Sequence, residues 1–275
     1  MSYHSDEAHG RADGYANRFK PFKTRPHAAG KTGGCLDRFP SKVYMHDEAL
    51  CGIESLEIKG HYGFNHVRCP WASRTPCSCG RHSLHLDSLI VAVDGACPGN
   101  GTHHATRSAC GVYFGPDMKE NLAVRLRDTP GYSHTSQRAE LRAAIIAIIA
   151  SMQFIYNGGQ WNCEGFSTPC AVVHLVIKSD SAYLVNGMTA HIDKWKRNGW
   201  RTAKGTEVKN KELWMELEDL IGWLHHDTGV AIDFWQVPRN QNTEADSLAN
   251  LGLASPVITD TDLSEMLSRA RIDDT

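Results

Sequence analysis

Four carboxylates lie where apolar runs end or helical stretches begin, a placement that suits metal-assisted chemistry on phosphate esters. Asp94 ends the run LIVAVD, and Asp180 ends the run AVVHLVIKSD. Glu140 and Asp246 lie near the starts of two helical stretches. Interior carboxylates that face one another repel, so they must bind protons or cations. Oxygen ligands from several elements suit Mg²⁺ or Mn²⁺, which also take ligands from phosphate.

The elements that must position these acids follow an α/β pattern. Short β-branched runs predict strands, and apolar residues at i, i+3, i+4 and i+7 predict a helix over TSQRAELRAAIIAIIASM. The predicted strands are residues 89–94, 110–115, 120–126, 171–180 and 230–237, and the predicted helices are residues 135–152, 182–196, 209–226 and 242–252. The order along the chain is therefore β-β-β-α-β-α-α-β-α.

Four motifs carry the acids in this order, and together they resemble the ribonuclease H family in its cellular bacterial and eukaryotic form. The motifs are DGACPGNG at 94–101, TSQRAEL at 135–141, SDS at 179–181 and NTEADSLA at 242–249. The resemblance covers residues 88–255 and implies a ribonuclease H-like fold with a five-stranded mixed sheet. It also implies that the catalytic, metal-binding acids are Asp94, Glu140, Asp180 and Asp246.

The resemblance implies a reaction as well as a fold. The expected activity is endonucleolytic hydrolysis of the RNA strand of RNA/DNA hybrids, which leaves 5′-phosphate and 3′-hydroxyl ends. Two Mg²⁺ ions, with Mn²⁺ as an alternative, would activate the attacking water and stabilise the leaving oxygen. The expected partner is the hybrid duplex, and protein partners are unknown.

Short polar side chains near the acids are candidates for contact with the hybrid, whose minor groove displays 2′-hydroxyls. By resemblance, the residues near the scissile bond are Cys97, Asn100, Ser136 and Gln137. Thr135 and Asn210 would help to form a pocket for a phosphate of the DNA strand. A helix N-cap is a competing and compatible role for Thr135 or Ser136.

A basic segment, residues 194–211, contains seven Lys or Arg residues and one acid, Glu207. Trp195 and Trp200 are interleaved with these cations. Cations neutralise phosphates, and aromatic faces pack on sugars or bases, so the segment is predicted to grip the DNA strand. It resembles the basic protrusion of the family. The alternative is a solvated amphipathic helix with core tryptophans.

The segment before the last acid departs from the family, which usually carries there a histidine that is thought to assist product release. The sequence VPRNQNTEAD has no histidine, and Arg239 or Asn240 occupies the neighbourhood. This departure bears on the turnover rate more than on the reaction, because the metal ions do the chemistry.

The chain outside the resemblance is rich in Cys, His and Gly. Residues 1–34 are predicted to be disordered, residues 35–87 to form a small loop-rich appendage, and residues 256–275 to form a tail or a short helix. Residues 157–170 look like an insertion. A structural Zn²⁺ site is a hypothesis for Cys69, Cys77, Cys79 and His82, although paired C-x₂₋₄-C spacing is absent. Free cysteines and surface histidines are the alternative.

Composition limits the class of protein. An apolar content of 41% and a charged content of 22% exclude collagen-like, coiled-coil and fully disordered chains. The net charge of −2 gives no overall basicity, so nucleic-acid binding must rest on local charge. The apolar run at 143–156 is too short to span a bilayer and predicts a buried helix. We expect an intracellular, cytoplasmic or nuclear monomer without membrane contact, since the N-terminus lacks the apolar stretch of a signal peptide.

Three other functions stay open at this point. A retroelement-derived ribonuclease H is one, which the lack of a polymerase segment in this sequence counts against. A catalytically weak hybrid-binding module is the second, which the presence of all four acids disfavours. The third is a nuclease of a related fold acting on DNA junctions or as an exonuclease, and the basic segment with its tryptophans favours hybrids instead.

Overall fold

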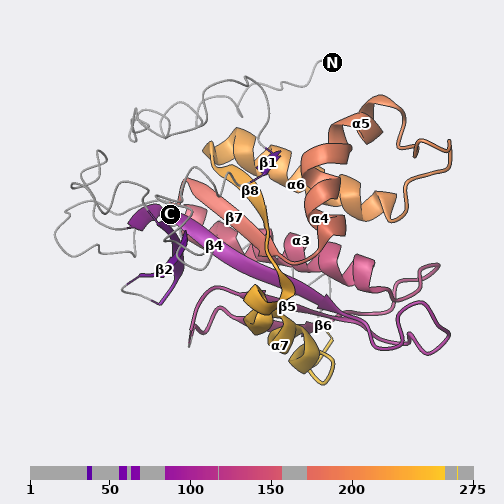
Figure 1. Ribbon diagram of the computed structural model, residues 1–275, viewed down its shortest axis with the longest axis horizontal. Helices are drawn as coiled ribbons and strands as arrows, with labels where there is room; N and C mark the ends of the chain where they lie inside the picture. Colours follow the sequence, from indigo (N-terminus) through magenta and orange to yellow (C-terminus); the bar gives the residue numbers. More distant parts are fainter. Residues whose placement is uncertain are drawn as a thin grey trace, which may run out of the picture.

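A mixed β-sheet with helices on both faces organises the protein (Figure 1). The computed structural model describes residues 36–38, 56–60, 63–68, 84–116, 118–156, 172–257 and 265. The α/β class is therefore confirmed, with a mixed sheet flanked by helices. All five predicted strands are present, as β4 (Leu84–Ala96), β5 (Ala109–Tyr113), β6 (Leu122–Arg125), β7 (His174–Ser179) and β8 (Ala231–Gln236).

The long strand β4 is the centre of the sheet. Its residues Ser88–Ala92 pair in parallel with β7, and its residues Ala92–Ala96 pair antiparallel with β5. β8 continues in parallel beyond β7, and β6 continues antiparallel beyond β5. Because the parallel strands β4 and β7 end at the same edge of the sheet, Asp94 and Asp180 meet there.

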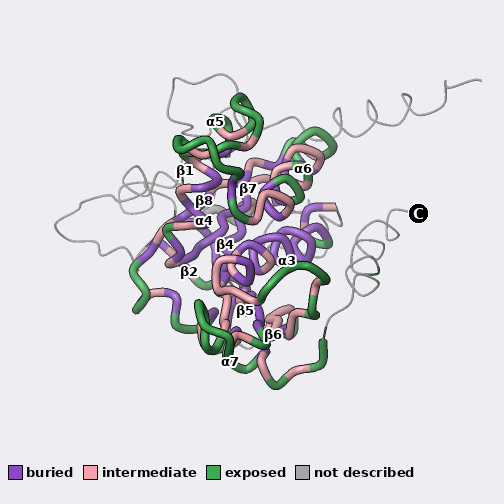
Figure 2. The backbone as a smooth tube through the Cα atoms, turned by 90° about the vertical axis from the view of Figure 1, so that its right-hand side faces the viewer, coloured by how far each residue is buried: buried purple, intermediate pink, exposed green. Residues whose placement is uncertain are grey.

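Helix α3 (Ser136–Tyr156) is the core helix. Its apolar side chains, among them Leu141, Ile145 and Ile148, are buried between β4 and helix α6 (Lys211–Thr228). By length and composition α3 could cross a membrane, but 72% of its most apolar window is buried inside the protein. The predicted buried helix is confirmed, and Figure 2 shows it as a largely buried tube in the middle of the molecule.

The helix predicted over residues 182–196 is divided into three parts. α4 (Ala182–Asn186) leads into a π-helical turn, η2 (Gly187–His191), which is followed by α5 (Ile192–Arg197). A Cβ atom at Gly187 would lie 2.1 Å from the ring of Trp214 on α6. The glycine therefore lets this buried indole pack directly against the backbone of η2.

Helix α7 (Thr243–Gly252) covers the face of the sheet opposite to α3 (Figure 1). It follows a short 3₁₀ turn, η3 (Arg239–Gln241), and packs on β4, β5 and β6. A Cβ atom at Gly111 of β5 would lie 2.1 Å from the carbonyl oxygen of Ala245. This close approach brings the first turn of α7, with Asp246, to the edge where β4 ends.

Three strands from the N-terminal region extend the sheet, which makes eight strands in the described structure instead of the predicted five. β1 (Leu36–Arg38) pairs in parallel with β8 at one edge. β2 (Glu57–Lys59) and β3 (Asn65–Arg68) form an antiparallel pair, and β3 pairs with the first part of β4. Strands of three or four residues are too short to show a periodicity in the sequence.

The N-terminal strands enclose a second, small hydrophobic core on the sheet face that α3 does not cover. It consists of Leu56, Val67, Ile90, Val176, Trp235 and Val237. Lys178 of β7 reaches into this region and donates to Glu57 of β2, which also accepts a hydrogen bond of 2.7 Å from Asn65 Nδ2. Only 9% of the Lys178 side chain and 16% of the Glu57 side chain are exposed. A buried ion pair thus joins the N-terminal region to the strand that leads to Asp180.

Candidate active site

The four predicted acids come from four elements and are all half-buried. Asp94 lies near the end of β4, Asp180 directly follows β7, Glu140 lies one turn into α3, and Asp246 lies in the first turn of α7. A Cβ atom at Gly95 would lie 2.4 Å from the backbone nitrogen of Glu140. The strand and the helix start therefore touch, which holds Asp94 and Glu140 at a fixed separation.

Among the described residues, each acid except Asp94 has a side-chain hydrogen-bond partner. Ser181 Oγ donates to Glu140 Oε2, and Asn242 Nδ2 donates to Asp180 Oδ1 at 3.2 Å. Arg239 Nη2 donates to Asp246 Oδ1 at 3.0 Å, and Asn250 Nδ2 donates to Asp246 Oδ2 at 3.1 Å. The Arg239 contact places a permanent cation in the neighbourhood where the ribonuclease H pattern usually has a histidine and this sequence has none.

Burial, together with neighbouring negative charges, raises the pKa values of two of the acids. Burial raises the pKa of Asp94 to about 6, and the charges of Asp180 and Asp246 add to the increase. Burial also raises the pKa of Glu140 to about 7, with a further increase from Asp94 and Asp180, although the hydrogen bond from Ser181 opposes it. Such a group of carboxylates favours the uptake of protons or cations.

The donor set fits a hard divalent cation. All four candidate ligands are carboxylates, the ligands that Mg²⁺ and Mn²⁺ prefer. In the described parts of the chain, no three His, Cys, Asp or Glu side chains form a ready-made metal cage. Mg²⁺ does not need one, because it commonly binds one or two carboxylates and completes its shell with water and substrate phosphate. The residues predicted to bind zinc, 69, 77, 79 and 82, lie outside the described residues.

The pKa values predict how stability depends on pH and Mg²⁺. Asp94 and Glu140 bind protons more tightly in the folded protein than in the unfolded chain, so their contribution to stability is present below about pH 4 and is lost as the pH rises through about 6 and 7. Mg²⁺ should offset this loss, and should therefore raise the melting temperature more at about pH 8 than at about pH 5. Thermal unfolding with and without Mg²⁺ measures both effects. An equal increase at both pH values would contradict the prediction.

The predicted hybrid-contacting residues gather around the start of α3. Asn100 Oδ1 accepts the backbone N–H of Ser136 at 3.1 Å, and Thr135 Oγ1 accepts that of Arg138 at 3.2 Å. The capping role considered for Thr135 is therefore present, while Ser136 is itself capped by Asn100. Cys97 is a free thiol with a pKa raised by burial, and like Gln137 it is half-buried.

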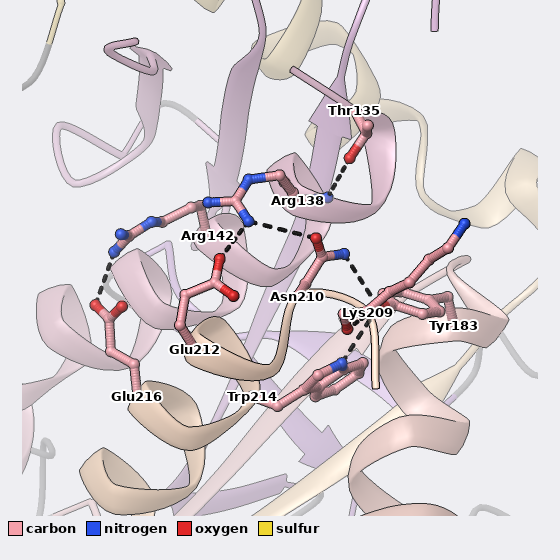
Figure 3. Close-up of polar contacts among 9 residues, drawn as sticks. All are labelled: Thr135, Arg138, Arg142, Tyr183, Lys209, Asn210, Glu212, Trp214 and Glu216. Atoms are coloured by element: carbon pink, nitrogen blue, oxygen red, sulfur yellow. Dashed lines mark hydrogen bonds and ion pairs between the residues drawn. The ribbon is translucent and has the colours of Figure 1, made fainter. Parts of the chain in front are cut away.

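A hydrogen-bond network holds Asn210 between α3 and α6 (Figure 3). Arg138 Nη1 donates to Asn210 Oδ1 at 3.3 Å and also pairs with Glu212. Asn210 Nδ2 in turn donates to the hydroxyl of Tyr183 at 3.1 Å, and Trp214 Nε1 donates to the same hydroxyl at 3.2 Å. Sequence reasoning missed Arg138 and Tyr183, although both lie in or beside the quoted motifs.

The basic segment combines exposed cations with tryptophan rings that pack against the protein. Trp195 and Trp200 are half-buried and pack against the main hydrophobic core. Both rings therefore have the core contacts that the alternative interpretation predicted for these tryptophans. The Trp195 ring lies 5.3 Å from that of Trp214. Within the described residues, the exposed cations of this segment that make no ion pair are Lys194, Arg197, Arg201, Lys204 and Lys209.

A mixed sheet that gathers four half-buried acids at one edge is consistent with a nuclease-like class of protein, in which carboxylates bind divalent metal ions beside a phosphate ester. Comparison of the sequence with known families identifies the family within this class. The chain belongs to the ribonuclease H family, because the family profile for RNase H matches residues 87–254. Membership implies dependence on a divalent metal ion.

Curated relatives agree with this assignment. Ribonuclease H1 of Rattus norvegicus is 37% identical over 254 residues, which cover 86% of this chain and 79% of the rat protein. Ribonuclease H1 of Homo sapiens is 35% identical over 207 residues, and that of Mus musculus is 38% identical over 170 residues. These matches span 72% and 60% of this chain, but only 63% of the human protein and 50% of the mouse protein.

The similarity of this chain to solved structures is weaker than its similarity to these relatives. The crystal structure of LC11-RNase H1 in complex with an RNA/DNA hybrid matches with a TM-score of 0.37 and 17% sequence identity. The match covers 60% of this chain and 96% of that chain.

Proposed function

We propose that the protein is an endonuclease that hydrolyses the RNA strand of RNA/DNA hybrids and leaves 5′-phosphate and 3′-hydroxyl ends. The observation that carries the proposal is the meeting of Asp94, Glu140, Asp180 and Asp246 at one sheet edge, with raised pKa values at Asp94 and Glu140. The hybrid is the substrate class that membership of the ribonuclease H family favours. Hybrids form where DNA is transcribed or copied, so the proposal includes a cytoplasmic or nuclear location.

In this proposal Asp94, Glu140, Asp180 and Asp246 hold two Mg²⁺ ions, with Mn²⁺ as an alternative. When bound, such ions supply an activated water and stabilise the leaving oxygen. The side chains fix the ligand positions: Ser181 orients Glu140, and Asn250 orients Asp246. The carboxylates must be deprotonated to bind metal, so activity should rise with pH through the range in which Asp94 and Glu140 titrate.

The polar groups at the start of α3 select the hybrid. Asn100, Ser136 and Gln137, with Cys97, would contact the minor groove beside the scissile bond, where 2′-hydroxyls distinguish RNA from DNA. Thr135 and Asn210 would bind a phosphate of the DNA strand, and Arg138 and Tyr183 keep the Asn210 amide in place.

The basic segment would add affinity without sequence preference. Replacing Lys204 and Lys209 together by glutamine should raise the KM for a hybrid severalfold, leave kcat unchanged, and reduce the dependence of binding on salt. The control is Lys119→Gln, which removes a 91% exposed cation from the β5–β6 connection. Binding measured over a series of salt concentrations checks this. An unchanged salt dependence in the double variant would show that the basic segment is not part of the surface that binds the hybrid.

The direct test is cleavage of a strand-labelled hybrid in Mg²⁺, beside single-stranded RNA, duplex RNA and duplex DNA. RNA-strand cleavage that is confined to the hybrid and lost in Asp180→Asn supports the proposal. Cleavage of duplex DNA, or full activity of the variant, would contradict it.

A second candidate, a catalytically weak hybrid-binding module, is favoured by one observation. Arg239 pairs with Asp246 and so competes with a metal ion for that carboxylate. Tight, salt-sensitive hybrid binding without cleavage, together with recovery of cleavage in Arg239→Ala, would favour this candidate.

A further inference from the structure

A buried asparagine links the elements that carry three of the acids. Asn242 lies between η3 and α7 and is 1% exposed. Its Nδ2 atom donates to the carbonyl oxygen of Val93 at 3.0 Å and to Asp180 Oδ1 at 3.2 Å. An amide NH₂ group has two protons, so both donors of the side chain are used.

These bonds join three parts of the site. Val93 immediately precedes Asp94 on β4, and Asp180 follows β7. The backbone carbonyl of Asn242 also accepts the N–H of Asp246 at 3.1 Å, which begins the first turn of α7. One residue therefore fixes the relative position of two strand ends and one helix start.

The remaining polar atom of Asn242 is unsatisfied. Its Oδ1 atom is buried and has no hydrogen-bond partner in the part of the chain that the structure describes. A buried acceptor without a hydrogen bond destabilises the folded state, so its presence needs an explanation. An apolar side chain of similar size would avoid this cost but would also remove the two donors. The two hydrogen bonds that Asn242 Nδ2 donates to Val93 O and Asp180 Oδ1 are thus what distinguishes asparagine from an apolar residue here.

We propose that Asn242 is a positioning residue, which holds the Asp180 carboxylate in register with Asp94 so that the two bind a divalent cation together. The proposal rests on the proposed function for the role of these acids. Partners that orient metal ligands typically change metal affinity by 10–100-fold. Asn242→Ala should therefore weaken Mn²⁺ or Mg²⁺ binding by about tenfold or more, and lower kcat at limiting metal with little change in the KM for the hybrid.

The test measures metal binding to the full chain in the absence of nucleic acid. Calorimetric titration with Mn²⁺ alone is compared for the wild type, Asn242→Ala and Asn121→Ala. Asn121 is a matched control, because its side chain also makes two hydrogen bonds that hold backbone, to Phe114 N and Gly115 O, both at 2.8 Å. It lies in the β5–β6 connection and carries none of the acids.

The expected result is that both variants lower the melting temperature but that only Asn242→Ala weakens Mn²⁺ binding. Equal Mn²⁺ affinity in Asn242→Ala and the wild type would show that Asn242 is merely structural and would overturn the proposal. If Asn242→Ala does not fold, Asn242→Ser, which retains one donor, takes its place and should also bind Mn²⁺ more weakly than the wild type.

A double variant tests whether Asn242 acts through Asp180. In an Asp180→Asn background, Asn242→Ala should cause no further loss of Mn²⁺ affinity, since the carboxylate that it orients is gone. A further loss of Mn²⁺ affinity as large as in the wild-type background would show that Asn242 does not act through Asp180. These titrations contain no hybrid, so they test the role of Asn242 independently of cleavage. A wild type that binds Mn²⁺ but cleaves no hybrid would contradict the proposed function without contradicting the positioning role of Asn242.

Discussion

Asp94→Asn is expected to reduce cleavage of an RNA/DNA hybrid by at least about a thousandfold, which corresponds to about 4 kcal/mol of lost transition-state stabilisation. The reason is its position: the charges of Asp180 and Asp246 both act on Asp94, and the neighbouring Gly95 packs against the start of α3. Asparagine has the same shape but cannot supply the negative charge that a divalent cation requires. Single-turnover cleavage at saturating Mg²⁺ measures the loss.

The melting temperature distinguishes a loss of catalysis in Asp94→Asn from a loss of folding. Because burial and like charges disfavour the ionised Asp94, its neutral replacement should raise the melting temperature of the metal-free protein above about pH 7. Asp219→Asn, which changes an exposed acid on α6, is the matched control and should alter neither activity nor melting temperature appreciably. An Asp94→Asn protein that cleaves as the wild type does would remove Asp94 from the active site.

Glu57→Ala is expected to lower the free energy of unfolding by about 3–5 kcal/mol. The substitution leaves the Lys178 ammonium group, whose side chain is 9% exposed, without its carboxylate in the second core. It also removes the acceptor of Asn65 Nδ2. Chemical denaturation measures the loss, which should be far larger than for an average surface substitution.

Two controls define the origin of this loss. Replacing the pair by apolar residues, as Glu57→Leu with Lys178→Met, should recover most of the stability, because no buried charge then remains. Glu216→Gln removes the partner of Arg142 in a pair whose side chains are 42% and 26% exposed, and should cost no more than about 1 kcal/mol. A loss in Glu57→Ala no larger than in Glu216→Gln would show that the second core contributes little.

The sequence predicted the elements that carry long apolar patterns. The strand runs and the amphipathic pattern of α3 are local signals, and the four acids lie at their ends, so the sheet edge and its acids could be placed together. The family resemblance, which the profile match confirms, fixed the order of the motifs. The roles of the individual acids and contact residues stay predictions.

Features that depend on distant contacts could not be predicted. Strand β2 has three residues, and its place in the sheet depends on Glu57 meeting Lys178 from a strand far along the chain. The break of the helix at η2 is visible only once Trp214 is known to pack on Gly187. The link from Asn242 to Val93 and Asp180 likewise joins residues that no local pattern relates.

The parallel pairing of β1 with β8 has a consequence for the order of folding. Leu36 is the register partner of Ile232, which lies almost 200 residues further along the chain. During synthesis β1 must therefore wait until β8 has left the ribosome before it can pair. Contacts of such sequence separation slow folding, so β1 is expected to be the last of the described strands to join the sheet although it is made before the others.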